Sequence, residues 1–366
     1  MIKESWYKIR HFDYIDALRG YAILGVIAVH TSQRAPSIAN PWKAWLDDGA
    51  RGVQLFFVAS ALTLMFSWHS RNDGAINFYI RRFFRIAPMF YLAVIVFVLL
   101  DGFAPRYYAP RGIGWWQIIT TVFFVNGWHP EYISSVVPGS WSIAVEMTFY
   151  LTFPILALSI KKFQTACIAL VVFLLVAALS KHPIALIWQL ILPRQEVYLT
   201  REFANLWFFH QFPCFLFGIV TFFAIEKWRI PKTPANLWLL LAISLIFIAP
   251  FVDDSFSVYA FLFSVVAFLL ANGAGSTTVV NPFVRFAGKV SFSAYLWHFA
   301  ILDIIDRLAE NGIDPIHVNS REHGLLFFFV FAPCVTALTL FLSNLTYRHV
   351  EQPMVRYGNY LARRVS

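Results

Sequence analysis

Long runs of apolar residues, separated by short polar segments, recur along the chain from beginning to end. A helix that crosses the hydrocarbon core of a membrane needs about 20 such residues. Runs of this length predict ten membrane-spanning helices, near residues 14–32, 50–69, 87–103, 139–160, 164–180, 205–226, 236–252, 256–273, 288–306 and 323–346. The pattern therefore predicts an all-α polytopic membrane protein whose single domain covers residues 1–366.

One further apolar run, at residues 116–127, is shorter than the others. With about 12 residues it is too short to cross the hydrocarbon core as a helix. We expect a re-entrant or interfacial segment there instead of an additional span.

Composition supports a membrane protein and excludes most soluble classes. Hydrophobic residues make up 59% of the chain and charged residues 13%, about half the charged share of a soluble domain. The formal net charge is +9, but the basic residues are scattered over many short loops, so we expect no nucleic-acid partner. Loops of this kind are typical of contacts with anionic membrane lipids.

The distribution of lysine and arginine predicts the orientation. With a cytoplasmic N-terminus, the inside segments include the basic groups at 3–10, 71–85, 161–162, 227–232, 285–289 and 348–364. Counting 116–127 as a span would move Lys161, Lys162 and the basic tail to the outside, against the positive-inside rule. We therefore expect ten spans with both termini in the cytoplasm.

The three cysteines indicate neither a metal site nor a disulfide framework. Cys167, Cys214 and Cys334 all lie in apolar stretches, and their spacing matches no metal-binding motif. We expect them to serve in core packing.

Two ionisable residues of the first predicted span are candidates for chemistry, because charged groups inside a membrane are costly. Arg19 and His30 are eleven residues apart, a rotation of about 1,100° on a helix, so both point to one face. The rise between them is about 16 Å. The alternative is an arginine that reaches the interface and an interfacial histidine at the two helix ends.

A basic cluster precedes the third predicted span. Arg82 and Arg85 share a helix face at spacing i and i+3, and Arg81 lies beside them. Arginine binds phosphate through paired hydrogen bonds, so this cluster is typical of a site for a nucleotide-like molecule. The alternative is a positive-inside anchor.

Two further ionisable residues lie inside predicted spans, and His210 is a weaker candidate of the same kind. Glu146 follows a Pro-Gly helix start and lies about 10 Å into its span, where a carboxylate needs a partner or a proton. Pairing with an arginine is its structural alternative. His298 falls in the middle of its span, where a lone histidine more often packs against neighbours than catalyses. Near the end of the chain, we interpret Arg348 and Glu351 as a structural ion pair at a helix end.

The ordered set of these motifs resembles the acyltransferase-3 family of membrane acyltransferases over nearly the whole chain. The residues that carry the resemblance are Asp16-Ala17-Leu18-Arg19-Gly20 with His30, Gly52 to Val58, Phe78 to Pro88, Ser140 to Glu146 with Phe149-Tyr150, Tyr295 with His298, and Glu351-Gln352-Pro353. Ala59-Ser60-Ala61 stands where the family usually has Ser-Gly. Many members carry a C-terminal hydrolase-like domain, and we expect this chain to be the stand-alone form.

The resemblance implies an enzyme of bacterial inner membranes. Its donor would be acyl-CoA, usually acetyl-CoA, taken as a substrate from the cytoplasm, with no tightly bound cofactor. Its acceptor would be a hydroxyl of an extracytoplasmic glycan or lipid-linked sugar, such as O-antigen or exopolysaccharide. The sequence does not identify the acceptor, the acyl chain or the oligomeric state.

Thioester acyl transfer needs a base or nucleophile, oxyanion stabilisation and a hold on the donor. Our hypothesis is that the cofactor-binding set Arg19, Arg81, Arg82 and Arg85 binds the phosphates of coenzyme A. His30 would then deprotonate the acceptor or carry the acyl group briefly, and the sequence leaves both possibilities open. We expect Glu146 and His298 to complete the catalytic set by orienting His30 or the acceptor. No metal is expected.

A secondary transporter or flippase of a small solute or lipid-linked sugar is the main alternative. Such proteins also carry ionisable residues within their spans. They often contain paired internal repeats, which this sequence lacks.

Overall fold

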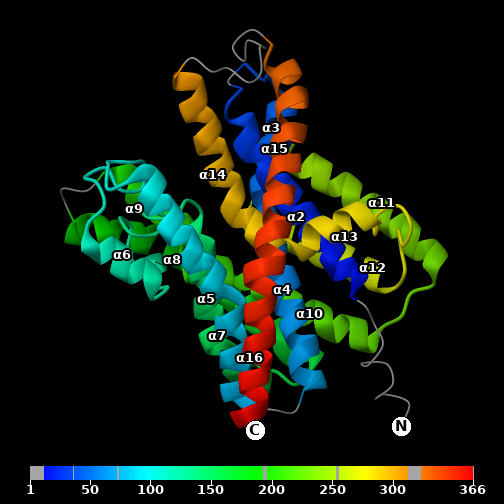
Figure 1. Cartoon of the computed structure of the whole chain (residues 1–366). Helices are drawn as coiled ribbons and strands as arrows, with labels where there is room; N and C mark the ends of the chain where they lie inside the picture. Colours follow the sequence, from blue (N-terminus) through cyan, green and yellow to red (C-terminus); the bar gives the residue numbers. More distant parts are fainter. Residues whose placement is uncertain are drawn as a thin grey trace. The chain divides into compact units, whose positions relative to one another are not determined.

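The computed structural model describes residues 12–35, 37–71, 74–192, 196–252, 255–311 and 323–365. Within these ranges the regular structure is helical, apart from an isolated bridge between Arg106 and Ala109. The helices are α2 (Asp13–Ser32), α3 (Trp42–Asp47), α4 (Gly52–Ser70), α5 (Gly74–Asp101), α6 (Trp115–Val122), α7 (Ser140–Ser159), α8 (Phe163–Ile191), α9 (Val197–Leu206), α10 (Phe208–Lys227), α11 (Lys232–Ile248), α12 (Phe256–Ala271), α13 (Pro282–Lys289), α14 (Ser291–Glu310), α15 (Gly324–Thr346) and α16 (Gln352–Val365), as Figure 1 shows. The predicted all-α class is confirmed.

Seven helical stretches among the described residues are long and apolar enough to cross a membrane. They are Trp42–Ser70, Gly74–Asp101, Ser140–Ser159, Phe163–Ile191, Val197–Lys227, Lys232–Phe251 and Gly324–Val365. The chain is therefore a polytopic membrane protein. Large apolar side chains point outward from these helices, including Leu99, which is 79% exposed, and Leu151 and Ile168. A bilayer removes such surfaces from water, so they need no protein partner.

The remaining predicted spans also fall on helices, although these are shorter or more polar. α2 carries Asp13, Asp16 and Arg19, and α12 has 16 residues. The predicted span at 288–306 is divided by Val290 into α13 and α14. The run at 116–127 forms the 8-residue α6 and a short turn of 3-10 helix, Asn126–Trp128, so neither element is long enough to span.

Several predicted boundaries are wrong in an informative way. α5 begins at Gly74 instead of near residue 87, and its 28 residues extend over about 42 Å, longer than the hydrocarbon core of about 30 Å. The arginine cluster therefore lies within the helix.

The last predicted span does not end at residue 346. It continues through a π-helical turn, Tyr347–Glu351, into α16. Pro353 follows directly on this turn, where the regular i to i−4 hydrogen-bond pattern of the α-helix is already interrupted.

The chain divides into two compact units. The first comprises residues 1–72, 214–292 and 318–336. Its centre is α2, which packs against α4 and α13. Glycines let the backbones touch, since a Cβ atom on Gly20 would lie 2.0 Å from the carbonyl oxygen of Val284, and one on Gly288 would lie 1.7 Å from that of Asp16. An ion pair between Asp13 and Arg285, at 2.6 Å, joins the same two helices.

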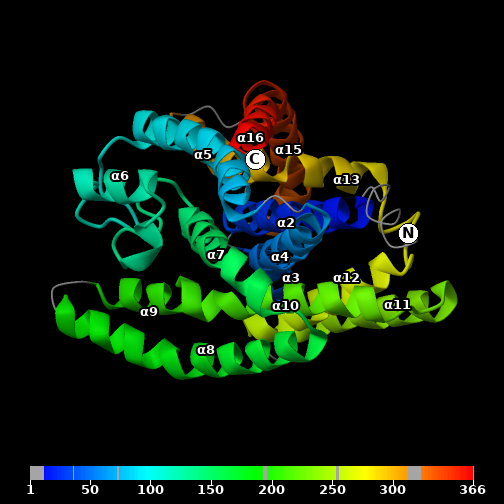
Figure 2. The same cartoon turned by 90° about the horizontal axis from the view of Figure 1, so that it is seen from below.

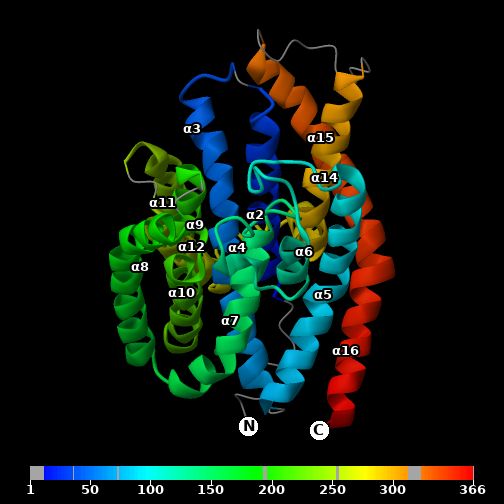
Figure 3. The same cartoon turned by 90° about the vertical axis from the view of Figure 1, so that its left-hand side faces the viewer.

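The second unit comprises residues 73–213, 293–317 and 337–366. In it α16 runs along α5, which Figure 3 shows in red and cyan. α8 and α9 lie side by side in the view of Figure 2. Gly358 of α16 sits against Phe84 of α5, where a Cβ would come within 2.6 Å of the phenylalanine side chain. Phe78 of α5 stacks on Phe153 of α7 with ring centroids 5.1 Å apart, which ties a third helix to this pair.

The contact between α2 and α13 gives a stability prediction. Replacing Gly288 by alanine places a methyl group against the carbonyl oxygen of Asp16, and neither backbone can move without separating the helices. We expect the Gly288→Ala variant to lose about 1–3 kcal/mol of stability, measured as a lower unfolding temperature in detergent. Gly114→Ala is the matched control, because its new Cβ would meet only the flexible end of the Gln117 side chain. Equal unfolding temperatures for the two variants would contradict this role of Gly288.

Candidate active site

Helix α2 presents Arg19 and His30 on one face, as predicted, because it is continuous from Asp13 to Ser32. Both residues are partly buried. The Nη2 of Arg19 donates to the Oγ1 of Thr63 on α4 at 3.0 Å, and this hydroxyl in turn donates to the carbonyl of Ala59 at 2.7 Å. A neighbouring helix of the same unit therefore holds the guanidinium. An arginine that only reached the membrane interface would not need this contact.

His30 lies near the end of α2, and the side chain of Gln33 fixes its ring. The Nδ1 of His30 is 3.2 Å from the Oε1 of Gln33. When Nδ1 carries the proton, the ring donates this hydrogen bond to the amide oxygen, and the lone pair is then on Nε2. Arg34 donates to the backbone carbonyl of His30 at 2.9 Å and stabilises the helix end. An imidazole whose Nε2 carries the lone pair is suited to act as a base or a nucleophile.

The basic cluster lies on α5 in the second unit. The guanidinium of Arg82 packs over the rings of Phe78 and Tyr150, 5.7 Å and 5.9 Å from their centroids. Arg85 forms an ion pair with Glu351, with its Nη1 at 2.5 Å from Oε1. The three arginines are thus inside a packed helix and partly buried, instead of extending freely from a loop.

The predicted ion pair between Arg348 and Glu351 is wrong. Glu351 pairs with Arg85 of α5 and accepts a hydrogen bond from the Oγ of Ser293 on α14 at 2.8 Å. Its carboxylate is fully buried, whereas Arg348 is exposed. Both residues belong to the π-helical turn Tyr347–Glu351, whose different residues per turn remove the geometry on which the i, i+3 prediction relied.

Glu146 finds its hydrogen-bond partner one turn further along α7. The hydroxyl of Tyr150 donates to its Oε1 at 2.5 Å. Arg85 is also near enough to interact electrostatically with Glu146, Tyr150 and Tyr347. A tyrosine hydrogen bond and a nearby arginine together stabilise the carboxylate, for which pairing with an arginine was the structural alternative in the sequence analysis.

His298 belongs to a buried polar cluster that joins the start of α7 to α14. It is fully buried, and its Nδ1 lies 3.1 Å from the carbonyl of Ala294. A carbonyl only accepts, so a hydrogen bond at this contact needs the proton of His298 on Nδ1. One turn away, the hydroxyl of Tyr295 donates to the carbonyl of Gly139 at 3.0 Å and accepts from Ser142 at 2.9 Å.

Gly139 makes this cluster possible. Its φ of +74° is the left-handed conformation that ends the loop before α7. A Cβ there would come within 2.8 Å of the Tyr295 hydroxyl and 2.9 Å of Phe299. The Pro-Gly signal that predicted a helix start therefore also marks a close approach of the backbone to two aromatic side chains.

The loop between α6 and α7 is anchored by buried polar groups. The amide of Asn126 donates to the carbonyl of Ile133 at 3.1 Å and to the Oγ of Ser140 at 3.2 Å. In the same loop, His129 stacks on Tyr132 with centroids 4.0 Å apart, and burial lowers the pKa of His129 to about 4. This histidine is therefore neutral near pH 7 and behaves as an aromatic packing residue.

The other residues singled out in the sequence have structural surroundings. The Nδ1 of His210 lies 3.5 Å from the carbonyl of Ala177. Cys214 is buried as expected, Cys167 is intermediate, and Cys334 is exposed, so the expectation of core packing is wrong for Cys334. Among the described residues, no group of three or more His, Cys, Asp or Glu could hold a metal ion.

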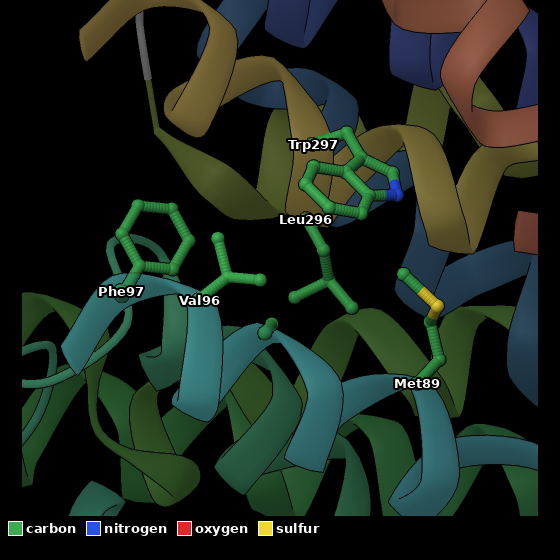
Figure 4. A pocket seen from close by; sticks show the side chains of 6 residues that line it. Met89, Val96, Phe97, Leu296 and Trp297 are labelled. Carbon is green, nitrogen blue, oxygen red and sulfur yellow. The ribbon is translucent and has the colours of Figure 1, made fainter. Parts of the chain in front are cut away.

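A small recess between α5 and α14 carries no reactive group. Figure 4 shows the side chains that line it, with methionine, valine and phenylalanine from α5 facing leucine and tryptophan from α14. The lining residues are Met89, Ala93, Val96, Phe97, Leu296 and Trp297. The recess is an apolar packing feature, and the candidate chemistry lies in the polar clusters.

Residues 12–348 match the sequence profile of a family described as an acyltransferase domain. The chain belongs to this family. It is 26% identical to a putative O-acetyltransferase of Staphylococcus aureus over 96% of this chain and 58% of that protein. It is 25% identical to the O-acetyltransferase OatA of the same species over 97% of this chain and 59% of OatA. The chain thus spans less than two thirds of these relatives. No solved structure matches.

The structure groups the predicted residues into two sets. Arg19 and His30 share a helix of the first unit, while Arg81, Arg82, Arg85, Glu146 and His298 belong to the second. Sequence reasoning did not pair Gln33 with His30 or Tyr150 with Glu146, although their spacings of three and four residues are helical-face signals. It also missed Ser293, for which the sequence offers no signal because its partner Glu351 is 58 residues away.

The tyrosine at the centre of the second cluster can be tested. The Tyr295→Phe variant keeps the ring but loses the hydroxyl that serves Gly139 and Ser142. We expect a loss of about 1 kcal/mol in stability, because the Gly139 carbonyl and the Ser142 hydroxyl each lose this partner and keep their hydrogen bond to each other. Thermal unfolding in detergent measures it, with Tyr357→Phe on the exposed side of α16 as control. An unchanged unfolding temperature in Tyr295→Phe would show that the Tyr295 hydroxyl does not contribute to stability.

Proposed function

We propose that this chain is an integral membrane O-acyltransferase. It moves an acyl group, with acetyl as the first candidate, from cytoplasmic acyl-CoA to a hydroxyl of an extracytoplasmic glycan or lipid-linked sugar. The observation that carries the proposal is the family match over residues 12–348, which includes the helix that bears Arg19 and His30. Membership of the family supports acyl transfer, and the names of the relatives support an O-linked acetyl product.

In the proposed step, the Nε2 of His30 takes the proton of the acceptor hydroxyl. The oxygen attacks the thioester carbonyl, the carbon–sulfur bond breaks, and the coenzyme A thiolate leaves and takes the proton back from the imidazolium. Gln33 supports this role because its amide oxygen lies where it accepts a hydrogen bond from a protonated Nδ1, the state in which Nε2 acts as the base. A brief acyl-imidazole intermediate is the other route that the same histidine permits.

We assign the donor to the basic residues. Arg81, Arg82 and Arg85, together with Arg19, supply guanidinium groups for the phosphates of coenzyme A. The pantetheine arm would extend along the membrane normal, and the rise of about 16 Å between Arg19 and His30 is comparable to its length. Glu146 and His298 are proposed to orient the acceptor or His30.

The proposed topology has ten spans in one domain of residues 1–366, with both termini in the cytoplasm of a bacterial inner membrane. Positive-inside charge distribution supports it. α6 would lie in the outer interface, because its exposed side chains are aromatic, with Trp115 at 74% and Trp116 at 68% exposure.

The activity itself can be measured with labelled acetyl-CoA. We expect purified protein in liposomes that contain lipid-linked saccharides to transfer labelled acetyl groups to the saccharides, and we expect His30→Ala to reduce the rate at least about 100-fold. The loss follows because the acceptor hydroxyl would have no base. His69→Ala is the matched control, since His69 is a solvent-side histidine of α4 in the same unit. Wild-type rates in His30→Ala would refute its assignment.

The topology predicts the labelling of single cysteines in a background without Cys167, Cys214 and Cys334. A cysteine at the exposed position of Tyr107 should react with a membrane-impermeant maleimide in intact cells, because its loop faces outward. A cysteine at the exposed position of Lys161 should react only after permeabilisation. Labelling of position 161 in intact cells would contradict the proposed orientation.

A further inference from the structure

Glu351 is an acidic residue that pairs with an arginine of α5, and its side chain is deeply buried. It is 1% exposed and lies in a π-helical turn, a feature often found at functional positions. Its two carboxylate oxygens have separate partners, the Nη1 of Arg85 on Oε1 and the Oγ of Ser293 on Oε2. Three helical segments, α5, α14 and the turn that precedes α16, therefore meet at one carboxylate.

The geometry leaves most of the Arg85 guanidinium outside this contact. A guanidinium has five N–H donors in a planar fork, and the ion pair with Glu351 uses one of its terminal nitrogens. The Ser293 hydrogen bond fixes the carboxylate plane, so the carboxylate in turn fixes the direction of the guanidinium. Arg82 lies one turn before Arg85 on the same face of α5 and is held against two aromatic rings.

Burial of this pair is difficult to explain by stability alone. Taking a carboxylate and a guanidinium out of water costs about as much as their attraction returns, and apolar residues of similar size are often no less stable. A buried pair is better explained when one partner must keep a charge in a defined direction for a ligand.

We propose that Glu351 is a positioning residue for the acyl donor, which orients Arg85 so that Arg85 and Arg82 together bind a phosphate of acyl-CoA. The inference rests on the proposed function, because it deepens the donor site assigned there. Without the negative charge of Glu351, Arg85 would turn to the nearest remaining carboxylate, Glu146, with which it already interacts electrostatically. The phosphate would then lose one of its two guanidinium partners.

The test compares two donors that differ in their phosphates. Acetyl-CoA carries them and acetyl-pantetheine does not, while both present the same thioester. We expect Glu351→Gln to raise the KM for acetyl-CoA about ten-fold, with the KM for acetyl-pantetheine and both kcat values changed less than about two-fold. Glu351→Asp should restore part of the acetyl-CoA affinity. Arg85→Gln should match Glu351→Gln, and the double variant should be no worse than either one, since both substitutions remove one interaction.

Two further variants keep the test decisive. Ser293→Ala leaves the ion pair in place and removes only the hydrogen bond that orients the carboxylate. If Glu351→Gln fails to fold, Ser293→Ala replaces it in the test. We expect it to raise the KM for acetyl-CoA by a smaller factor. Gln352→Ala, which removes the partner of the exposed Arg356 on the same helix, is the matched control and should change neither donor.

The outcomes separate the inference from the proposed function. Equal KM increases for both donors, additive effects of the Arg85 and Glu351 variants, or tighter acetyl-CoA binding in Glu351→Gln would overturn the positioning role. Calorimetric titration of the protein in nanodiscs with coenzyme A gives an affinity that does not require turnover. Wild-type protein that binds coenzyme A but transfers no acetyl group would refute the acyltransferase proposal, while the affinities of the variants would still decide the role of Glu351.

Discussion

A charge inside a membrane protein must be matched by groups that the protein itself supplies, and the second unit is organised around one such match. The Glu351 carboxylate has no access to solvent, and it is satisfied by Arg85 of α5 and Ser293 of α14. If Arg85 were removed, the buried charge of Glu351 would be left without compensation, which costs several kcal/mol. The association of α16 with α5 therefore brings together packing and charge compensation, with Gly358 of α16 allowing the close approach to Phe84.

In the first unit, the central helix that must be packed is polar, since α2 is the most polar of its long helices. Close backbone contacts at Gly20 and Gly288 hold α2 against α13, and the pair formed by Asp13 and Arg285 adds a polar contact near the same interface. Small residues at helix contacts are effective in membranes because there is little hydrophobic driving force between helices. This packing fixes the helix on which Arg19 and His30 share a face.

The two candidate histidines have the same local chemistry on different helices. In each, Nδ1 lies within hydrogen-bond distance of an oxygen acceptor, which is the Oε1 of Gln33 for His30 and the backbone carbonyl of Ala294 for His298. The partner of His298 is part of its own helix, and the residue is fully buried among aromatic neighbours. His30 is only partly buried and its partner is a side chain at the end of α2. This difference favours His30 as the residue that meets substrate and His298 as a positioning residue.

The sequence by itself determined the helical class, the repeated membrane-length apolar runs, the shared face of Arg19 and His30, and the family resemblance. These depend on residues close together in the chain or on hydrophobicity summed over a window. Only the tertiary structure decided the partners of the buried charges. In an α-helix, the spacing of three residues would pair Glu351 with Arg348. The π turn at Tyr347–Glu351 changes the direction of the Glu351 carboxylate, and Ser293 donates to it from another helix. Such pairings depend on how helices pack at ångström distances, because a charge in a low-dielectric interior takes whichever partner the packing brings within reach.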